Sequence, residues 1–298
     1  MAIVARPYQA ADDLRLMQGL QQELWALEGP RVLTHVGDLA WWATQHVGRE
    51  QDWVRRLWLE GDRCVAWAWL RRPSSLDYEV HRAHMRGPLH DEVLSWFELH
   101  AEGEGPLSTF ALEDDGDRLD VLAERGYSRP DDGTCYVYYV QEVADEQALP
   151  PLLRGFSFRT VDGERDLRER VDVHREVWAP SRVTEESYRN VMRVWPYRPE
   201  LDCVIAAPDG AFVAYALCWN DPQNRVGELE PVGTRPGHRG QGFGAAVCRY
   251  VLERLRRVGA RWAIVYAGGR DEAAPARKLY ESVGFRRHTR AVELRKAR

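Results

Sequence analysis

The hydrophobic pattern is clearest in residues 155–298, where segments of two different periods follow one another. Residues 155–161 alternate apolar and polar side chains, and residues 165–178 repeat apolar side chains every three or four positions. The first pattern is typical of a strand and the second of an amphipathic helix. Beyond them, the pattern predicts a shorter helix near 184–194 and strands at 201–207 and 211–219, with "APDG" as the hairpin turn.

The rest of this region predicts further strands and helices in alternation. Residues 225–234 are expected to form a strand, and residues 242–259 a helix with one apolar face. The nearly continuous apolar run 261–267 is typical of a strand covered on both faces. A last helix near 272–283 and a strand at 285–294 complete the series. The elements together predict a mixed α/β (α+β) fold.

The N-terminal part of the chain repeats features of this region at a fixed offset. Four residues recur 153 positions later: Arg6, Asp13, Leu14 and Trp25 correspond to Arg159, Asp166, Leu167 and Trp178. Between the copies, Pro150 and Pro151 break a polar stretch, which favours a linker. We therefore expect two tandem domains, 1–145 and 156–298, joined by a linker at 146–155. Each is expected to hold a mixed, mostly antiparallel central sheet flanked by helices.

Composition narrows the classes of function. The 298 residues carry a formal net charge of −5 with a pI near 6.0, so the chain lacks the basic surface typical of nucleic-acid binding. No apolar run approaches the roughly 18 residues of a membrane helix, and the N-terminus lacks a signal-peptide pattern. The five scattered cysteines are expected to be buried thiols in a reducing compartment. We expect a cytoplasmic protein that binds neither nucleic acid nor membrane.

A glycine-rich run between a predicted strand and a predicted helix suggests a ligand site. Gly237, Gly240, Gly242 and Gly244 lie within "RPGHRGQGFG". Such a turn directs backbone N–H groups and the positive end of a helix dipole at one point, which suits a phosphate or pyrophosphate. The run does not end in Gly-Lys-Ser/Thr, and Val247 stands where a dinucleotide fingerprint needs its third glycine. Coenzyme A remains as the ligand, and an ordinary tight turn is the alternative.

Three segments in order resemble the GNAT superfamily of acyl-CoA-dependent N-acetyltransferases. Arg239-Gly-Gln-Gly242-Phe-Gly244 is similar to the family's Arg/Gln-x-x-Gly-x-Gly/Ala signature. The preceding "ELEPVGT" and the distal "ARKLYESVGF" resemble its fourth strand and its final helix. The resemblance covers 156–298 directly and 1–145 through the internal repeat. This tandem layout is similar to that of mycothiol synthase-like two-domain acetyltransferases.

The resemblance implies an activity and a set of cofactor contacts. It implies transfer of an acetyl group from acetyl-CoA to a primary amine of a small molecule or peptide, by direct attack in a ternary complex. The strand end Val232, Gly233 and Thr234 would bind the pantetheine arm through its backbone. The pyrophosphate would be held by the amides of Arg239, Gly240, Gln241, Gly242, Phe243 and Gly244. Ala273 departs from the asparagine that the family often carries there. A non-catalytic acyl-CoA-binding or sensing protein is the alternative function.

The predicted reaction needs a base, because an amine with a pKa near 10 is mostly protonated at neutral pH. Glu228 and Glu230 stand two apart on a strand and so share a face. Glu228 occupies the family position of a carboxylate acting through water, and the choice between the two stays open. Tyr280 occupies the family position of the general acid. Solvated carboxylates and a packed tyrosine are the alternatives. Backbone amides would stabilise the oxyanion, so no metal is expected, and Cys248 is expected to be packed.

The N-terminal copy lacks the glycine-rich run. Its counterpart holds Gly87 followed by Pro88, which removes an amide, so we expect no ordinary acetyl-CoA site there. This copy is expected to stabilise the second domain or to supply a wall of the acceptor pocket. Its three nearby histidines and one aspartate match no metal-ligand spacing: His81, His84, His90 and Asp91. Trp25 and Trp178 are candidates for lining acceptor pockets, with core packing as the alternative.

Overall fold

The first half of the chain contains one complete set of the repeated elements. The computed structural model describes residues 2–143, 146 and 148–298, and we call 2–143 the first half and 148–298 the second half. In chain order the first half forms β1 (Ile3–Pro7), α1 (Ala11–Glu28), α2 (Val36–Thr44), β2 (Trp53–Glu60), β3 (Arg63–Arg71), β4 (Ser75–Val80), α3 (Pro88–His100), β5 (Leu107–Leu112), α4 (Gly116–Glu124) and β6 (Cys135–Glu142).

The second half repeats this order with ends that lie within a few residues of those predicted. It forms β7 (Ser157–Thr160), α5 (Gly163–Val177), α6 (Glu185–Arg193), β8 (Asp202–Ala206), β9 (Phe212–Asp221), β10 (Val226–Thr234), α7 (Phe243–Arg257), β11 (Trp262–Gly268), α8 (Ala274–Ser282) and β12 (Arg286–Lys296). Short 3-10 helices stand before or after several elements: Glu50–Asp52, Arg82–His84, Pro199–Leu201, Pro236–His238 and Asp271–Ala273.

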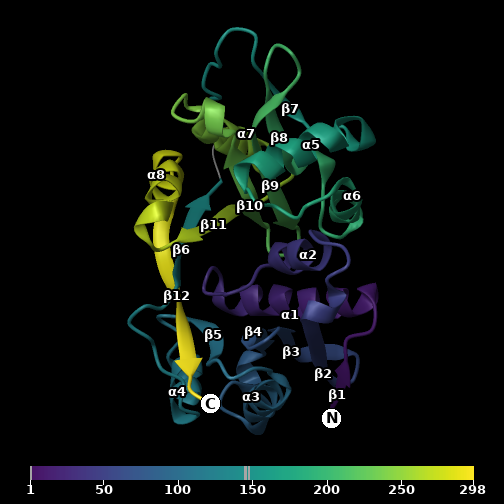
Figure 1. Ribbon diagram of the computed structural model, residues 1–298, viewed down its shortest axis with the longest axis vertical. Coiled ribbons are helices and arrows are strands. Elements are labelled where there is room, and N and C mark those ends of the chain that lie inside the picture. The colour runs from purple at the N-terminus through teal and green to yellow at the C-terminus, as the bar shows by residue number, and fades with distance from the viewer. Residues whose placement is uncertain (1, 144–145, 147) are drawn as a thin grey trace.

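A single twelve-stranded sheet runs through both halves, with helices packed against it (Figure 1). Neighbouring strands are antiparallel except for β4 with β5 and β10 with β11, which are parallel. The predicted class, a mixed α/β fold of two tandem units with mostly antiparallel sheets and flanking helices, is confirmed. The sequence did not predict that the two sheets are continuous.

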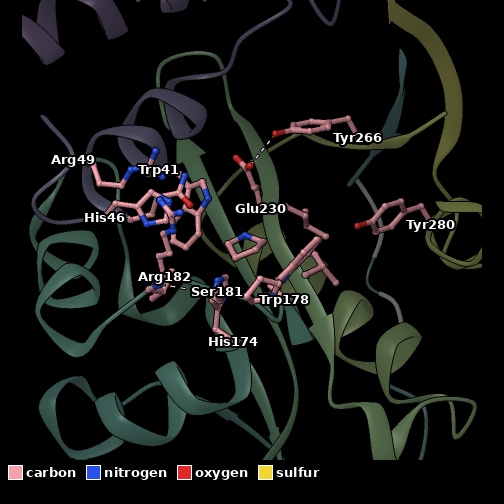
Figure 2. Close-up of a pocket in the computed structure, with 16 residues that line it drawn as sticks. Trp41, His46, Arg49, His174, Trp178, Ser181, Arg182, Glu230, Tyr266 and Tyr280 are labelled. Atoms are coloured by element: carbon pink, nitrogen blue, oxygen red, sulfur yellow. Dashed lines mark hydrogen bonds between the residues drawn. The ribbon is translucent and has the colours of Figure 1, made fainter. Parts of the chain in front are cut away.

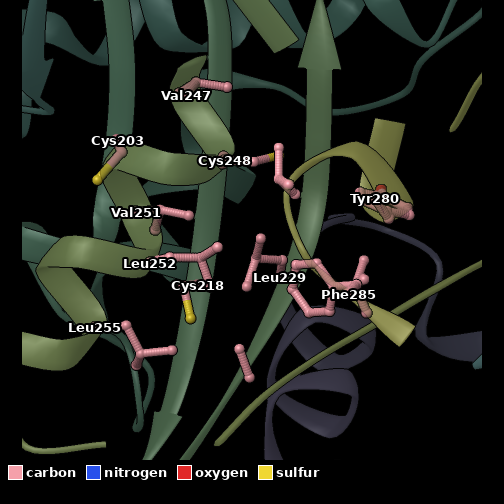
Figure 3. Packing of buried hydrophobic residues seen from close by; sticks show 14 of the residues in the cluster. Cys203, Cys218, Leu229, Val247, Cys248, Val251, Leu252, Leu255, Tyr280 and Phe285 are labelled. Carbon is pink, nitrogen blue, oxygen red and sulfur yellow. The ribbon is translucent and has the colours of Figure 1, made fainter. Parts of the chain in front are cut away.

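The core of the second half explains why these residues form these elements. Every residue of β8 and β9 is buried, as expected of strands covered on both faces. The apolar face of α7 packs Val247, Val251 and Leu255 against these strands (Figure 3). Cys248 is fully buried in the same cluster, which agrees with the expected packed thiol. Burial also raises the pKa of this thiol to about 12, so it is not poised as a nucleophile.

Two expectations from composition can be compared with the structure. All five cysteines are free, and four are buried, whereas Cys135 is half-buried. In the part of the chain that the structure describes, no helix is both long enough and apolar enough to cross a membrane.

The two halves exchange their last strands. The strand order in the middle of the sheet is β5-β12-β6-β11, so the last strand of each half lies beside the fifth strand of the other. β6 pairs with β11 along Trp262–Gly268 and with β12 on its other edge. In Figure 1, β12 runs from the second half down to the first. The predicted division at 146–155 stays a prediction, because the sheet crosses it.

This exchange predicts that the second half does not fold well alone. A fragment of residues 156–298 lacks β6 and leaves facing edges of β11 and β12 unpaired. We expect the fragment to lack the cooperative thermal unfolding of the full chain, measured by circular dichroism. A fragment that unfolds cooperatively at the same temperature as the full chain would contradict this role of β6.

Helix α2 of the first half packs directly on the second half. Gly37 lies so close to Trp219 of β9 that an added Cβ would be 2.4 Å from the Trp219 Cβ. Ala40 and Trp41 share a buried cluster with Trp219 and Tyr188. The helix therefore needs glycine at its second position, and this close packing brings α2 beside β10.

Candidate active site

The parallel strands β10 and β11 separate part-way along their length. They pair only from Val226 to Glu228, opposite Trp262 to Ile264. Beyond Glu228, the register of β10 against β9 shifts between Leu229 and Val232, which marks a bulge. The strands therefore leave an opening that begins at Glu228.

One edge of this opening is the unpaired side of β10. The Arg235 amide donates to the Val213 carbonyl at 2.8 Å, so the backbone groups of Arg235 face β9. In an antiparallel pair the backbone groups of alternate residues face the partner strand, so those of Gly233 face β9 as well. The backbone groups of Val232 and Thr234 consequently face away from β9, toward the opening. An added Cβ at Gly233 would lie 2.7 Å from Val177, so this position needs glycine for packing. The free edge is where the sequence predicted contacts to pantetheine.

The glycine-rich run forms a turn between β10 and α7. Gly240 and Gly242 have φ of 76° and 83°, in the left-handed region that favours glycine. A Cβ at either residue would meet no atom within 4 Å, so both face open space. Gly244 differs, because its Cβ would lie 3.2 Å from the Thr234 hydroxyl oxygen and close to Leu279. The first two glycines thus serve the turn, and the last serves close packing against Thr234 and α8.

The amides of this turn are free to bind a ligand. Among the described residues, no carbonyl or side chain accepts from the amides of Gly240, Gln241 and Gly242. Phe243 and Gly244 lie in the first turn of α7, where amides have no partner within the helix. Free donors of this kind and a helix dipole are the features that suit an anion. The sequence predicted the pyrophosphate at this turn.

A cavity of ≈ 440 Å³ opens beside β10 and is lined by both halves (Figure 2). The first half contributes Trp41, Gln45, His46 and Arg49 from α2 and the loop after it. The second half contributes β10 residues 229–232 and, from other elements, His174, Trp178, Pro180, Ser181, Arg182, Val183, Tyr266 and Tyr280. The N-terminal copy therefore does supply a wall of this cavity.

Three carboxyl groups from the two halves meet at this cavity. Glu230 lines it, whereas Glu228 is only 1% exposed and lies behind, with Asp38 of α2 beside them. One oxygen of each carboxyl group lies within 4.8 Å of the others. The His35 Nδ1 atom is 3.3 Å from Glu228 Oε2. This spacing also suits a metal ion, so the metal-free reaction stays a prediction.

The electrostatics of the cluster keep part of it protonated. Burial and the neighbouring Glu228 raise the pKa of Glu230 to about 8, although the Tyr266 hydroxyl donates to Glu230 Oε1 at 2.8 Å and opposes the rise. Burial and the two glutamates raise the pKa of Asp38 well above its usual value. Carboxylates so close together disfavour simultaneous ionisation. Glu230 thus has a pKa suited to proton transfer near neutral pH.

Tyr280 of α8 lies on the opposite side of the opening. It is 7% exposed and lines the cavity, with its ring near Tyr139 and Phe285. Figure 2 shows its hydroxyl directed toward β10. Burial raises the pKa of this phenol, so it stays protonated. Within the described residues the hydroxyl has no hydrogen-bond partner, which differs from the packed and satisfied tyrosine of the alternative.

Only one of the two predicted pocket tryptophans lines the cavity. Trp178 is 52% exposed, follows α5, and donates from Nε1 to the Tyr215 hydroxyl at 2.7 Å. Trp25 is buried in a core cluster with Leu57 and Trp67 and does not line the cavity. α1 continues past Trp25 to Glu28, whereas α5 ends at Val177, directly before Trp178. The placement of Trp25 therefore favours core packing.

Comparison with known families places the glycine-rich turn and the cavity strands in one family. Residues 169–285 match the model of the acetyltransferase (GNAT) family. This match covers less than half of the chain. A 60-residue segment is also 43% identical to mycothiol acetyltransferase of Nocardiopsis dassonvillei. That match covers 20% of this chain and only 18% of the relative's length.

Solved structures extend the GNAT likeness to the whole fold. A GCN5-related N-acetyltransferase from Sphaerobacter thermophilus matches with a TM-score of 0.64 and 21% identity, covering 99% of this chain and 95% of that one. A tandem GNAT protein from the clavulanic acid biosynthesis pathway matches with a TM-score of 0.67 and 15% identity, covering 99% and 98%. At these identities the likeness concerns the fold, and it includes the first half.

At the first half's counterpart of the glycine-rich turn, arginines pair with the protein's own carboxylates. α3 begins directly at Pro88, after Gly87. Arg82 pairs with Glu28 and with Asp115, and these three residues line a second cavity. Arg86 likewise pairs with Asp117 and Asp120. His90 is not free for a metal, because its nitrogens contact the Tyr78 hydroxyl and the Met85 carbonyl.

Sequence reasoning missed Asp38 of the first half and Tyr266 of the second half as residues of this site. Asp38 accepts a hydrogen bond from the His35 amide at 2.7 Å and caps α2, so its sequence context indicates only a helix start. Tyr266 lies in a strand that the pattern explains as buried. Neither the 3.6 period nor the internal repeat indicates contacts between α2 and β10. Ala273 stands before α8, as its sequence position predicted.

Proposed function

We propose that the protein is an acetyl-CoA-dependent N-acetyltransferase whose acceptor is a primary amine. One observation carries the proposal. The turn with unpaired amides directly follows β10, and Glu230, the carboxyl group with the raised pKa, lies on β10 in the adjoining cavity. A cofactor arm running along that strand would join the two features. The match of residues 169–285 to the acetyltransferase (GNAT) family supports the coarser proposal, an acyltransferase of that family.

The residues of the turn fit the diphosphate of acetyl-CoA. The amides of Gly240, Gln241 and Gly242 have no other partner among the described residues, and a Cβ at either glycine would fill the space that they face. Arg239 is exposed beside them and adds a positive charge. Val232 and Thr234 offer backbone groups along β10 for an extended amide-containing arm. The acetyl group would then lie between Glu230 and Tyr280.

The side chains of the cavity supply both proton transfers. Glu230 accepts a proton from the acceptor ammonium group, which frees the nitrogen lone pair to attack the thioester carbon. When the carbon–sulfur bond breaks, Tyr280 donates its proton to the sulfur. The attacking nitrogen loses a second proton as the amide forms, and this proton goes to Tyr280 and restores its hydroxyl group. The products are an amide and a thiol, and one proton stays on Glu230 until solvent takes it.

The test is release of coenzyme A thiol from acetyl-CoA across a library of amines. We expect release that depends on the amine, and mass spectrometry of the product should show one added acetyl group. Tight binding of acetyl-CoA without amine-dependent release would instead support a sensing protein. No binding of acetyl-CoA would contradict both functions.

The assigned role of the turn predicts that Gly242→Leu weakens acetyl-CoA binding about 10-fold. A side chain there stands in the space that the diphosphate must enter, and it is strained at a φ of 83°. The measurement is the dissociation constant by calorimetry. Gly210→Leu is the matched control, because Gly210 has a φ of 91° and open space around it but lies in the β8–β9 hairpin. Equal losses in the two variants would contradict the assignment.

A further inference from the structure

The cavity has a basic end that the proposed reaction does not use. His46, Arg49 and Arg182 line it and are grouped on the side away from Tyr280 (Figure 2). His46 and Arg49 come from the segment after α2 of the first half, and Arg182 comes from the loop between α5 and α6. The basic end is therefore assembled from both halves.

The charges at this end are not fully compensated by the protein. Arg49 pairs with Asp52 through its Nε atom at 2.5 Å. Arg182 is exposed, lines the cavity and forms no ion pair with any residue that the structure describes. The Nδ1 atom of His46 is buried without a hydrogen-bond partner. A buried polar atom without a partner is costly, so the His46 Nδ1 atom favours a ligand that satisfies it.

The groups at the basic end act on one another. Burial, Arg49 and Arg182 lower the pKa of His46, so this histidine is neutral near pH 7 and has one nitrogen that donates. Two guanidinium groups and one imidazole N–H then converge on the same space. Guanidinium groups bind carboxylate and phosphate oxygens through paired N–H donors.

The opposite end of the cavity is acidic. Glu230 lines it, and its Oε2 atom is buried without a hydrogen-bond partner. Asp38 and Glu228 lie behind it. A ligand that satisfies both ends needs a cationic group and an anionic group separated by the aromatic wall of Trp41 and Trp178.

We infer that the acceptor is a small molecule with a primary amine and an anionic group, a carboxylate or a phosphate, which Arg182 binds together with Arg49 and His46. This inference rests on the proposed function, because the amine end is the reacting end. The cavity of ≈ 440 Å³ also holds the acetyl end of the cofactor, so the acceptor is a small molecule. Its anionic group fixes which amines reach Glu230.

The experiment compares amines in matched pairs that differ in the anionic group. Free α-amino acids are compared with their amides, and ethanolamine phosphate and glucosamine 6-phosphate with ethanolamine and glucosamine. For the full chain we expect kcat/KM at least about 10-fold higher for the anionic member of the preferred pair, as for a charge-assisted hydrogen bond. The amino acid pairs report carboxylate recognition, and the other pairs report phosphate recognition.

Variants test whether the basic end causes the preference for the anionic member of a pair. Arg182→Ala is expected to bring the ratio of kcat/KM within the preferred pair close to one, mainly through KM, and Arg182→Lys to restore part of it. Arg168→Ala is the matched control, because that side chain is 86% exposed on α5 and outside the cavity. It should keep the ratio of the unchanged chain.

The outcomes separate this inference from the proposed function. Acetylation of both members of every pair with equal kcat/KM would overturn the dipolar acceptor and leave the acetyltransferase standing. If acetyl-CoA binds but no amine reacts, the pairs are titrated by tryptophan fluorescence with coenzyme A present, and equal affinities would also overturn the inference. Failure to bind acetyl-CoA would overturn the proposed function itself.

Discussion

Replacing Glu230 by glutamine is expected to lower kcat for acetyl transfer about 10²- to 10⁴-fold, the range for loss of a general base. The KM for acetyl-CoA should stay close to that of the unchanged enzyme, because Glu230 faces the acceptor cavity rather than the glycine-rich turn. Glutamine keeps the shape of the side chain and its ability to accept from Tyr266. The measurement is steady-state kinetics with the preferred amine.

The pH dependence assigns this effect to proton transfer. The base must be deprotonated to act, so kcat/KM should rise with pH through about 8, the raised pKa of Glu230. Glu230→Gln should abolish that rise. Glu228→Gln should move it to lower pH, because the charge of Glu228 contributes to the raised pKa of Glu230.

Controls keep the interpretation specific. Glu164→Gln changes an exposed carboxylate on α5 and should leave kcat and the pH profile unaltered. We also predict that a chelator leaves the rate unaltered, because the proposed proton transfers need only Glu230 and Tyr280. Near-normal turnover of Glu230→Gln, or an unchanged pH midpoint, would remove Glu230 from the mechanism.

Replacing Tyr280 by phenylalanine is expected to lower kcat about 10²-fold, the lower end of the range for a general acid. The lower end applies because burial raises the pKa of Tyr280, and a weaker acid transfers its proton less readily. Phenylalanine fills the same space between Tyr139 and Phe285, so the KM for acetyl-CoA should change little. Steady-state kinetics at saturating amine measure the change.

A matched variant separates chemistry from packing. Tyr250→Phe removes a hydroxyl from α7, where the ring packs against Phe158 with centroids 4.9 Å apart, and it should leave kcat unaltered. Equal rates for Tyr280→Phe and the unchanged enzyme would show that Tyr280 only packs. If Tyr280→Phe lowers thermal stability and leaves kcat unaltered, Tyr280 likewise only packs.

Local patterns predicted the elements of the second half because each depends on neighbours in sequence. The glycines of the turn are an example, since their left-handed φ angles and open surroundings are properties of a few consecutive residues. The expectation that Glu228 and Glu230 share a face agrees with their common approach to Asp38, despite the bulge after Leu229.

The strand exchange could not be predicted from the sequence. Residues 135–142 and 286–296 are each compatible with a strand in either half. The pattern specifies a face of each strand and not its neighbours. Only the complete sheet shows that β6 lies between β11 and β12.

The residues that the first half contributes to the candidate site could not be predicted from the sequence either. Asp38, Trp41 and Arg49 lie more than a hundred residues before β10, and no alignment of motifs brings them to Glu230. Their placement depends on the packing of Gly37 against Trp219, which is a contact between halves. Of the two tryptophans that the internal repeat matches, Trp178 lines the cavity and Trp25 lies in the core.

The central claim is that the turn after β10 holds the diphosphate of acetyl-CoA, and a crystal structure of the complex tests it most directly. We predict diphosphate oxygens within about 3 Å of amide nitrogens between Arg239 and Gly244, with the thioester between Glu230 and Tyr280. A diphosphate bound elsewhere, for instance at the loop after β4, or a thioester remote from the cavity would contradict the account.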